Sequence, residues 1–216
     1  MEDVIGIVSG ILNATLFFFI SLYIIIVKKN KDYSHYFFIF ITLSISLSGL
    51  FGTFKYTDDY EVALHLSKIS IIFLSISLYF FVLFTYYLRI GINKKIPLFL
   101  IFPLIFIITL IIGPLIEGIE PTPNTWLFIL NPGYLFIFSL FLYLYFFLGL
   151  YNLIIVYRNI DRVLKVKILY FVIGALIVLI FMVIHSVVIA IWSTYLPFPD
   201  ISFILSGILY FYALTK

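Results

Sequence analysis

The chain has 216 residues, of which 64% are apolar and 11% are charged. Because an ordinary soluble domain carries about 25% charged residues and no more than about 50% apolar ones, this composition excludes a soluble globular protein and indicates a chain that folds mostly in lipid. The chain contains no cysteine, which excludes a disulfide framework, a thiolate metal site and a cysteine nucleophile. The formal net charge is +3, and its distribution along the chain carries more information than its size.

Long apolar stretches dominate the sequence. A membrane-spanning helix needs about 20 consecutive, mainly apolar residues, and seven stretches qualify: 4–27, 36–54, 69–88, 96–116, 134–157, 168–192 and 197–215. We therefore expect an all-α, polytopic membrane protein, a single seven-helix transmembrane domain over residues 1–216. Two acidic residues precede the first stretch, and its apolar core is too long for a cleavable signal peptide, so we expect it to be the first span.

The charged residues fall on two sides of the predicted bundle. Eleven of the 13 basic residues follow the first, third, fifth and seventh spans, namely Lys28, Lys29, Lys31, Arg89, Lys94, Lys95, Arg158, Arg162, Lys165, Lys167 and Lys216. Eight of the ten acidic residues lie on the other side. Cytoplasmic loops carry the excess of Lys and Arg. The sequence thus predicts a multi-pass protein of the cell membrane with its N-terminus outside and its C-terminus in the cytoplasm.

Polar residues are distributed unevenly across the predicted spans. No Asp, Glu, Lys or Arg lies deep inside any of them, which argues against a proton pump, a voltage sensor and a retinal protein. Thirteen uncharged polar or histidine residues lie in the outer halves and four in the inner halves. Two interpretations stay open, helix packing and an outward-facing cavity. Packing is expected for one face of span 36–54, formed by Thr42, Ser46, Gly49 and Thr53.

His185, near the outer boundary of the sixth span, is the sharpest candidate for a site residue. Its imidazole would either contact a ligand or external protons, or be a neutral group bonded to a neighbouring helix. Asn13, Trp126 and Asn131 complete the set of candidate ligand contacts. The segment from Trp126 to Leu130 is too apolar for free solvent. By default we expect it to lie on the membrane surface as an aromatic belt, and the alternative is a lid folded over the bundle.

The remaining histidines do not suggest a metal site. His65 lies just before the third span, where it would approach His185, but two histidines without a third ligand make a weak case for a metal. We expect His35 to be a solvated loop residue. The sequence predicts no metal, no cofactor and no nucleic-acid partner, and it contains no phosphate-binding glycine loop.

A series of short motifs runs through the second half of the chain. In order they are Trp126, Asn131-Pro132-Gly133-Tyr134, Tyr157-Arg158, the basic residues Arg162, Lys165 and Lys167, Leu169-Tyr170-Phe171, Gly174, Tyr195 with Pro197 and Pro199, and Tyr212-Ala213. From about residue 60 onward, this series resembles the N-terminal seven-transmembrane sensor region of prokaryotic histidine kinases. The resemblance implies an extracytoplasmic or intramembrane input that passes through the last span to a cytoplasmic signalling domain.

The resemblance does not extend to kinase activity. Members of that family continue into dimerisation, sensor or kinase domains, whereas this sequence stops at Lys216 without a phosphoacceptor helix or an ATP-binding segment. We therefore expect a stand-alone sensor or receptor-like module that signals to a separate cytoplasmic protein. The alternative is a small transporter or channel for an uncharged or weakly polar solute. An enzyme is not expected, because no nucleophile–base pair or metal cluster lies on one face of a span.

Overall fold

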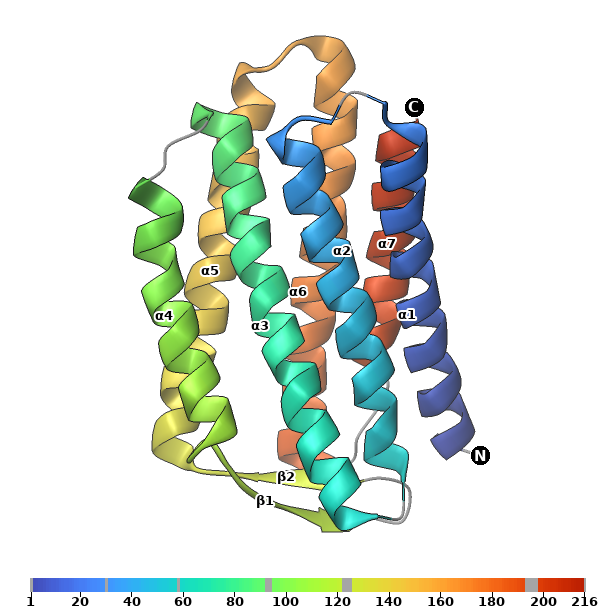
Figure 1. The fold of residues 1–216 in the computed structure, drawn as a ribbon, viewed down its shortest axis with the longest axis vertical. Helices are drawn as coiled ribbons and strands as arrows, with labels where there is room; N and C mark the ends of the chain where they lie inside the picture. The colour runs from blue at the N-terminus through green and yellow to red at the C-terminus, as the bar shows by residue number, and fades with distance from the viewer. Residues whose placement is uncertain are drawn as a thin grey trace.

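The computed structural model describes residues 2–29, 31–57, 59–91, 95–121, 126–192 and 198–215. Within these ranges the chain forms seven α-helices, one 3-10 helix and one β-hairpin (Figure 1). The helices are α1 (Glu2–Val27), α2 (Tyr33–Gly52), α3 (Tyr60–Ile90), α4 (Lys95–Ile112), α5 (Pro132–Asn159), α6 (Arg162–Trp192) and α7 (Phe198–Thr215), with the 3-10 helix η1 (Thr53–Tyr56) and the strands β1 (Ile116–Pro121) and β2 (Trp126–Leu130).

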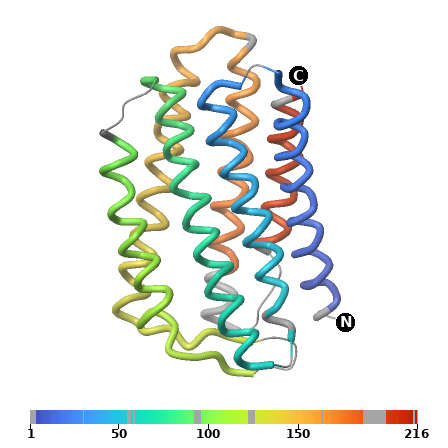
Figure 2. Tube along the Cα trace, in the orientation of Figure 1, coloured from blue at the N-terminus to red at the C-terminus, as the bar shows by residue number. Residues whose placement is uncertain are grey.

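The helices run roughly parallel to one axis in two layers. Helices α4, α3, α2 and α1 lie in front in Figure 1, and α5, α6 and α7 lie behind them. The two chain ends are at opposite ends of the bundle (Figure 2). We call the end with the N-terminus, the hairpin and η1 the hairpin end. The other end, at which α1, α3, α5 and α7 end, is the basic end.

Local sequence signals explain several helix ends. Asp59 caps α3 by accepting a hydrogen bond from the backbone N–H of Val62 at 3.1 Å. Asp32 and His35 form a reciprocal capping box at the start of α2, so His35 is a capping residue and the expectation of a merely solvated loop residue is wrong. Helix α3 ends at Gly91, whose φ of +82° favours glycine.

The outer surface of the bundle is apolar. Large side chains point outward on every helix, including Phe99 on α4, 76% exposed, and Phe136 on α5, 70% exposed. Five helices are long and apolar enough to cross a membrane, with candidate spans at Val4–Val27, Tyr33–Gly52, Tyr60–Ile90, Pro132–Asn159 and Leu164–His185. The apolar parts of α4 and α7 are shorter, Ile96–Ile112 and Pro199–Ala213. The protein is therefore an all-α membrane bundle, as its composition predicts.

The structure corrects the sequence analysis between residues 113 and 130. The predicted span 96–116 ends as a helix at Ile112, and the chain enters β1 at Ile116. Strands β1 and β2 pair antiparallel, with Glu120 opposite Leu127. This hairpin is the one departure from purely helical structure among the described residues. The residues that the structure describes do not include Asp58, Lys94, Tyr195, Pro197 or Lys216.

The predicted packing face of α2 is confirmed. Ser46 donates a hydrogen bond to the backbone carbonyl of Ala14 on α1 at 2.7 Å, and the hydroxyls of Thr42 and Ser21 lie 2.6 Å apart. A Cβ atom added at Gly49 would lie 3.2 Å from the carbonyl oxygen of Gly10. Helices α1 and α2 thus approach closely through small and hydroxylated residues, the usual composition of helix contacts in membranes.

Candidate functional site

A cavity of about 360 Å³ lies at the hairpin end, between α1, α2, α3, β2, α6 and α7. We call it the hairpin-end cavity. Its volume falls in the lower part of the range of small-molecule sites, about 300–1,000 Å³. Its polar lining consists of Asn13, Ser48, Thr53, Ser67, Ser70, Trp126, His185 and Asp200. Three of the four candidate contacts predicted from the sequence, Asn13, Trp126 and His185, therefore share one cavity.

Asn13 is the most unusual of these residues. Its side chain is only 2% exposed. The amide nitrogen Nδ2 donates a long hydrogen bond of 3.5 Å to Oδ1 of Asp200, whereas the amide oxygen Oδ1 is buried with no hydrogen-bond partner among the described residues. A buried acceptor left without a donor costs about 1–3 kcal/mol. Asn13 lines the cavity, but this oxygen is itself buried, so the side chain must turn before the oxygen can accept a hydrogen bond from a bound molecule.

Asp200 brings a formal charge to the cavity. It lies in the first turn of α7, where the positive end of the helix dipole stabilises a carboxylate. Among the described residues that line the cavity, Asp200 is the one that carries a formal charge at neutral pH when His185 is counted as neutral. The candidate contacts predicted from the sequence did not include Asp200. An acid following Pro199 at the start of a span was the available signal, because such a residue lies in a first helical turn.

His185 lines the cavity from α6 together with Met182, three residues earlier. His65 does not share this position. It is exposed on α3 and pairs with Glu61 at 3.2 Å, and it is not among the residues lining the cavity. No group of three or more metal-ligating side chains occurs in the part of the chain that the structure describes.

Strand β2 forms the wall of the cavity at the hairpin end. Trp126, Leu127, Phe128 and Leu130 all line it. The indole N–H of Trp126 donates to the backbone carbonyl of Thr57 at 2.7 Å, and its ring packs edge-on against Tyr60. These contacts tie the hairpin to the α2–α3 connection. The segment thus covers this end of the bundle, as the lid interpretation had it.

Asn131 lies apart from the other three candidates. Its side-chain oxygen caps α5 by accepting from the backbone N–H groups of Gly133 at 3.1 Å and Tyr134 at 3.4 Å. Its amide nitrogen donates to Glu117 at 2.8 Å. Both ends of the amide are used for structure, and Asn131 does not line the cavity. An Asn before Pro at the start of a helix is a common capping sequence, which explains the residue without a ligand.

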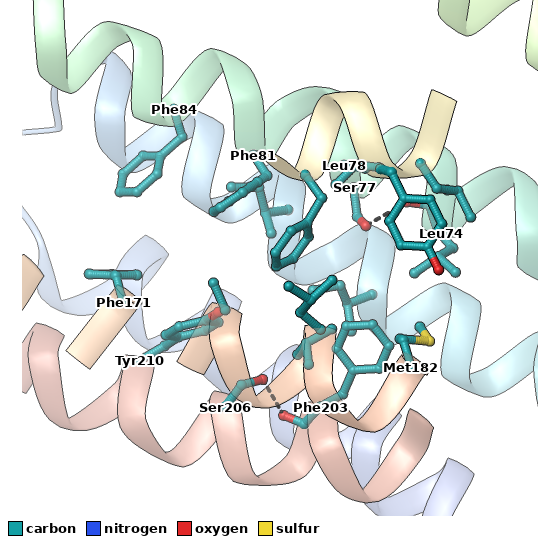
Figure 3. Close-up of a pocket in the computed structure, with 18 of the residues that line it drawn as sticks. Leu74, Ser77, Leu78, Phe81, Phe84, Phe171, Met182, Phe203, Ser206 and Tyr210 are labelled. Atoms are coloured by element: carbon teal, nitrogen blue, oxygen red, sulfur yellow. Dashed lines mark hydrogen bonds between the residues drawn. The ribbon is translucent and has the colours of Figure 1, made fainter. Parts of the chain in front are cut away.

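A second cavity of about 320 Å³ lies deeper in the bundle, and we call it the aromatic chamber. Side chains from α2, α3, α5, α6 and α7 line it, and Figure 3 shows Phe81 of α3 facing the space that Phe203 and Tyr210 of α7 enter from the opposite side. The polar groups on its wall are hydroxyls, and those of Ser77 and Ser206 are bonded to backbone carbonyls of their own helices. The chamber is thus predominantly apolar.

The two cavities adjoin one another. Four residues line both of them: Ile45 of α2, Leu74 of α3, Met182 of α6 and Phe203 of α7. All four are apolar, and methionine is the most adaptable of the large apolar side chains. The hairpin-end cavity therefore continues, past these four side chains, into the aromatic chamber, and both spaces are lined mainly by apolar surface.

Towards the basic end, several polar side chains are buried, and the amide nitrogen Nδ2 of Asn152 is buried without a hydrogen-bond partner among the described residues. Ser21 and Thr42 are both 0% exposed and bond one another as well as backbone carbonyls of their own helices. The Asn152 side-chain oxygen accepts from the Arg89 guanidinium at 3.0 Å. None of these four residues lines either cavity. The polar groups of this half serve helix packing.

Comparison with known protein families, curated proteins and solved structures found no match to this chain.

Proposed function

We propose that this protein is a sensor or receptor-like module of the cell membrane, which binds its ligand in the hairpin-end cavity and signals to a cytoplasmic protein. The observation that carries the proposal is the cavity at the hairpin end, where Asn13, His185 and Asp200 lie among mainly apolar side chains. Neither cavity is lined by the buried polar residues Ser21, Thr42 and Asn152 towards the basic end. A cavity that reaches only one end of the bundle suits a ligand that enters and leaves from one side.

We further propose seven membrane crossings, with the hairpin end outside. Helices α4 and α7 have 18 residues each, a length of about 27 Å, close to the hydrocarbon thickness of about 30 Å. Successive helices run in opposite directions along the bundle (Figure 1). Arg158 and Arg162 lie at the basic end, so the positive-inside rule places that end in the cytoplasm.

The basic end is the proposed output surface. Arg158 and Arg162 are exposed at the α5–α6 connection, and the exposed Arg89 joins α3 to α5 through Asn152. Helix α7 runs from Asp200 at the cavity to this end of the bundle. A ligand that shifts α7 would change the surface offered to a cytoplasmic protein, in agreement with the resemblance to histidine-kinase sensor regions.

The alternative function, a small transporter or channel, finds less support. A conduction path needs polar or hydrated lining through to the cytoplasm. The aromatic chamber is predominantly apolar, and Ser21 and Thr42 beyond it are buried with their hydroxyls bonded. The receptor is therefore the better interpretation.

Affinity purification of the full chain in mild detergent tests the signalling proposal. We expect the wild-type protein to recover a cytoplasmic signalling protein, and the double variant Arg158→Gln/Arg162→Gln to recover much less of it. The variant Glu120→Gln, which changes an exposed charge at the hairpin end, is the control and should behave as wild type. Recovery of no signalling protein across several growth conditions would count against the proposal.

A further inference from the structure

The aromatic chamber is large enough to hold a molecule of its own. Its volume of about 320 Å³ is roughly twice that of the 150 Å³ apolar cavity that binds benzene in another protein. Protein interiors otherwise contain few voids larger than a water molecule. The described residues that line the chamber include no acidic, basic, amide or imidazole side chain. A charged ligand would lose its hydration there without compensation, so the chamber suits a neutral one.

Aromatic rings dominate the wall of the chamber. Nine of its 22 lining residues are Phe or Tyr. The rings of Phe81 and Phe146 are stacked with their centroids 6.0 Å apart. Both of them, and the ring of Phe203, are only half-buried, so they retain surface that a ligand can cover. Aromatic rings favour offset-stacked and edge-to-face contacts with other rings, contacts that a linear alkyl chain does not make. The wall therefore favours a ligand built of rings.

Two glycines make room for rings of this wall. A Cβ atom added at Gly149 of α5 would collide with the ring of Phe81, and one added at Gly174 of α6 would lie 2.5 Å from Cε1 of Tyr210. Each ring therefore lies directly against the backbone of a neighbouring helix, where any larger residue would displace it. Both rings line the chamber. Its shape thus depends on particular small residues of the sequence and is not a random packing defect.

The surroundings of the chamber indicate where a ligand comes from. Towards the basic end it is closed by the buried rings of Phe38, Phe84 and Phe171, whose centroids lie within 5.6 Å of one another, and Figure 3 shows Phe84 and Phe171 together at one end of the space. On the α5 side, in contrast, none of the lining residues is buried, and Tyr143 is 41% exposed. The outer surface of α5 is apolar, so this side faces the bilayer.

We propose that the aromatic chamber binds a compact, neutral ring compound of about the size of naphthalene, which reaches it from the bilayer past α5. Two fused rings match a volume about twice that of a benzene site. This site is separate from the ligand site proposed at the hairpin end, and the inference does not depend on that site.

Photolabelling of the full chain tests the proposal and locates the ligand. The protein in nanodiscs of uncharged lipid is illuminated with 1-azidonaphthalene, and mass spectrometry of its fragments identifies the labelled residues. We expect saturable labelling of chamber-lining residues of α3, α5 and α7, reduced at least five-fold by excess naphthalene. Helix α4 lines neither cavity and is the internal control. Its outward-facing Phe99 and Phe102 should label in proportion to the reagent and resist competition.

Two competitors test the chemical class of the ligand. Decane has the ten carbons of naphthalene but no ring, and 2-naphthalenesulfonate has the same ring system with a charge. We expect each to compete at least five-fold less well than naphthalene at equal membrane concentration.

Filling variants test the position of the site. Leu142→Trp places a larger side chain on the chamber wall and should reduce the competable label at least five-fold. Leu144→Trp makes the same change two residues away, at a position that is 59% exposed on the outer surface, and should label as wild type. Ala175→Leu fills the chamber from α6 and replaces Leu142→Trp if that variant does not fold.

Several results would overturn the inference: label that naphthalene does not displace from any chamber residue, decane that competes as well as naphthalene, or a Leu142→Trp variant that keeps its competable label. Competable label confined to the hairpin-end cavity would also overturn it, because the ligand would then occupy the other site. The receptor proposal is tested separately, by recovery of a cytoplasmic partner.

Discussion

The crossing of α1 and α2 gives the sharpest stability prediction. A Cβ atom at Gly49 would lie 3.1 Å from Nδ2 of Asn13, 3.2 Å from the carbonyl oxygen of Gly10 and 3.3 Å from the backbone nitrogen of Ala14. Two of these three atoms are backbone and cannot rotate away, so Gly49→Ala must push the helices apart. Overpacking of this kind typically costs about 1–3 kcal/mol. Replacing glycine by alanine in a helix also gains up to about 1 kcal/mol, which partly masks the loss.

A matched substitution at a second glycine corrects for the stability gained when alanine replaces glycine in a helix. Gly133→Ala in the first turn of α5 makes the same chemical change, and its Cβ meets only Oδ1 of Asn131 at an ordinary 3.5 Å. We therefore expect the free energies of unfolding of the two variants to differ by about 1–3 kcal/mol, with Gly49→Ala the less stable. Titration with a denaturing detergent in mixed micelles measures both. Equal stabilities would refute the close α1–α2 crossing, and with it the placement of Asn13 beside α2.

Three further predictions concern other parts of the fold. Gly91→Ala should lose about 1–3 kcal/mol of unfolding free energy, because φ is +82° there and no atom lies near enough to clash; an unchanged melting temperature would contradict this. Thr42→Val should lose about 0.5–1.5 kcal/mol, since it removes the 2.6 Å bond to Ser21, and a double-mutant cycle with Ser21→Ala should show non-additivity. Partial burial raises the pKa of Asp32, but hydrogen bonds from Ser34 and His35 and the charge of His35 outweigh it and lower the pKa overall. Because a depressed carboxyl pKa stabilises the fold above the unfolded-state value and loses this effect as the pH falls, the stability difference between wild type and Asp32→Ala should shrink below about pH 4, and a difference that grew on acidification would contradict the cap.

The helical part of the fold could be predicted from the sequence because lipid imposes a simple rule. Every backbone polar group in the bilayer must be bonded internally, so a long apolar stretch has little choice but a helix. The packing face of α2 could be predicted too, because residues spaced as Thr42, Ser46 and Gly49 share one side of a helix. The hairpin is not subject to this constraint. Its strands lie at the end of the bundle, where β1 and β2 satisfy one another, and the apolar run of Trp126 to Leu130 is equally compatible with a belt, a lid or a strand.

The sequence predicts only part of the candidate site. Asn13 and His185 stand out because a polar side chain among apolar ones in a span needs a partner or a cavity. Asp200 does not stand out, because an acid that follows two prolines at the start of a span looks like any loop charge until α7 brings it within 3.5 Å of Asn13. Asn131 was selected for its polarity, and its bonds to Gly133 and Glu117 show that local capping accounts for it. Contacts between distant helices decided these cases, and such contacts leave no short sequence pattern.

Cysteine labelling of intact cells tests the central claim most directly, namely that a cavity open to the outside ends within the bundle. The native chain has no cysteine, so each variant carries a single thiol. We expect Ser48→Cys and Ser70→Cys on the cavity wall to react with a membrane-impermeant thiol reagent added outside. Thr42→Cys and Thr85→Cys, both buried towards the basic end, should stay inert from either side. Labelling at all four positions would establish a conduction path, and labelling of position 70 only from the cytoplasmic side would reverse the proposed orientation.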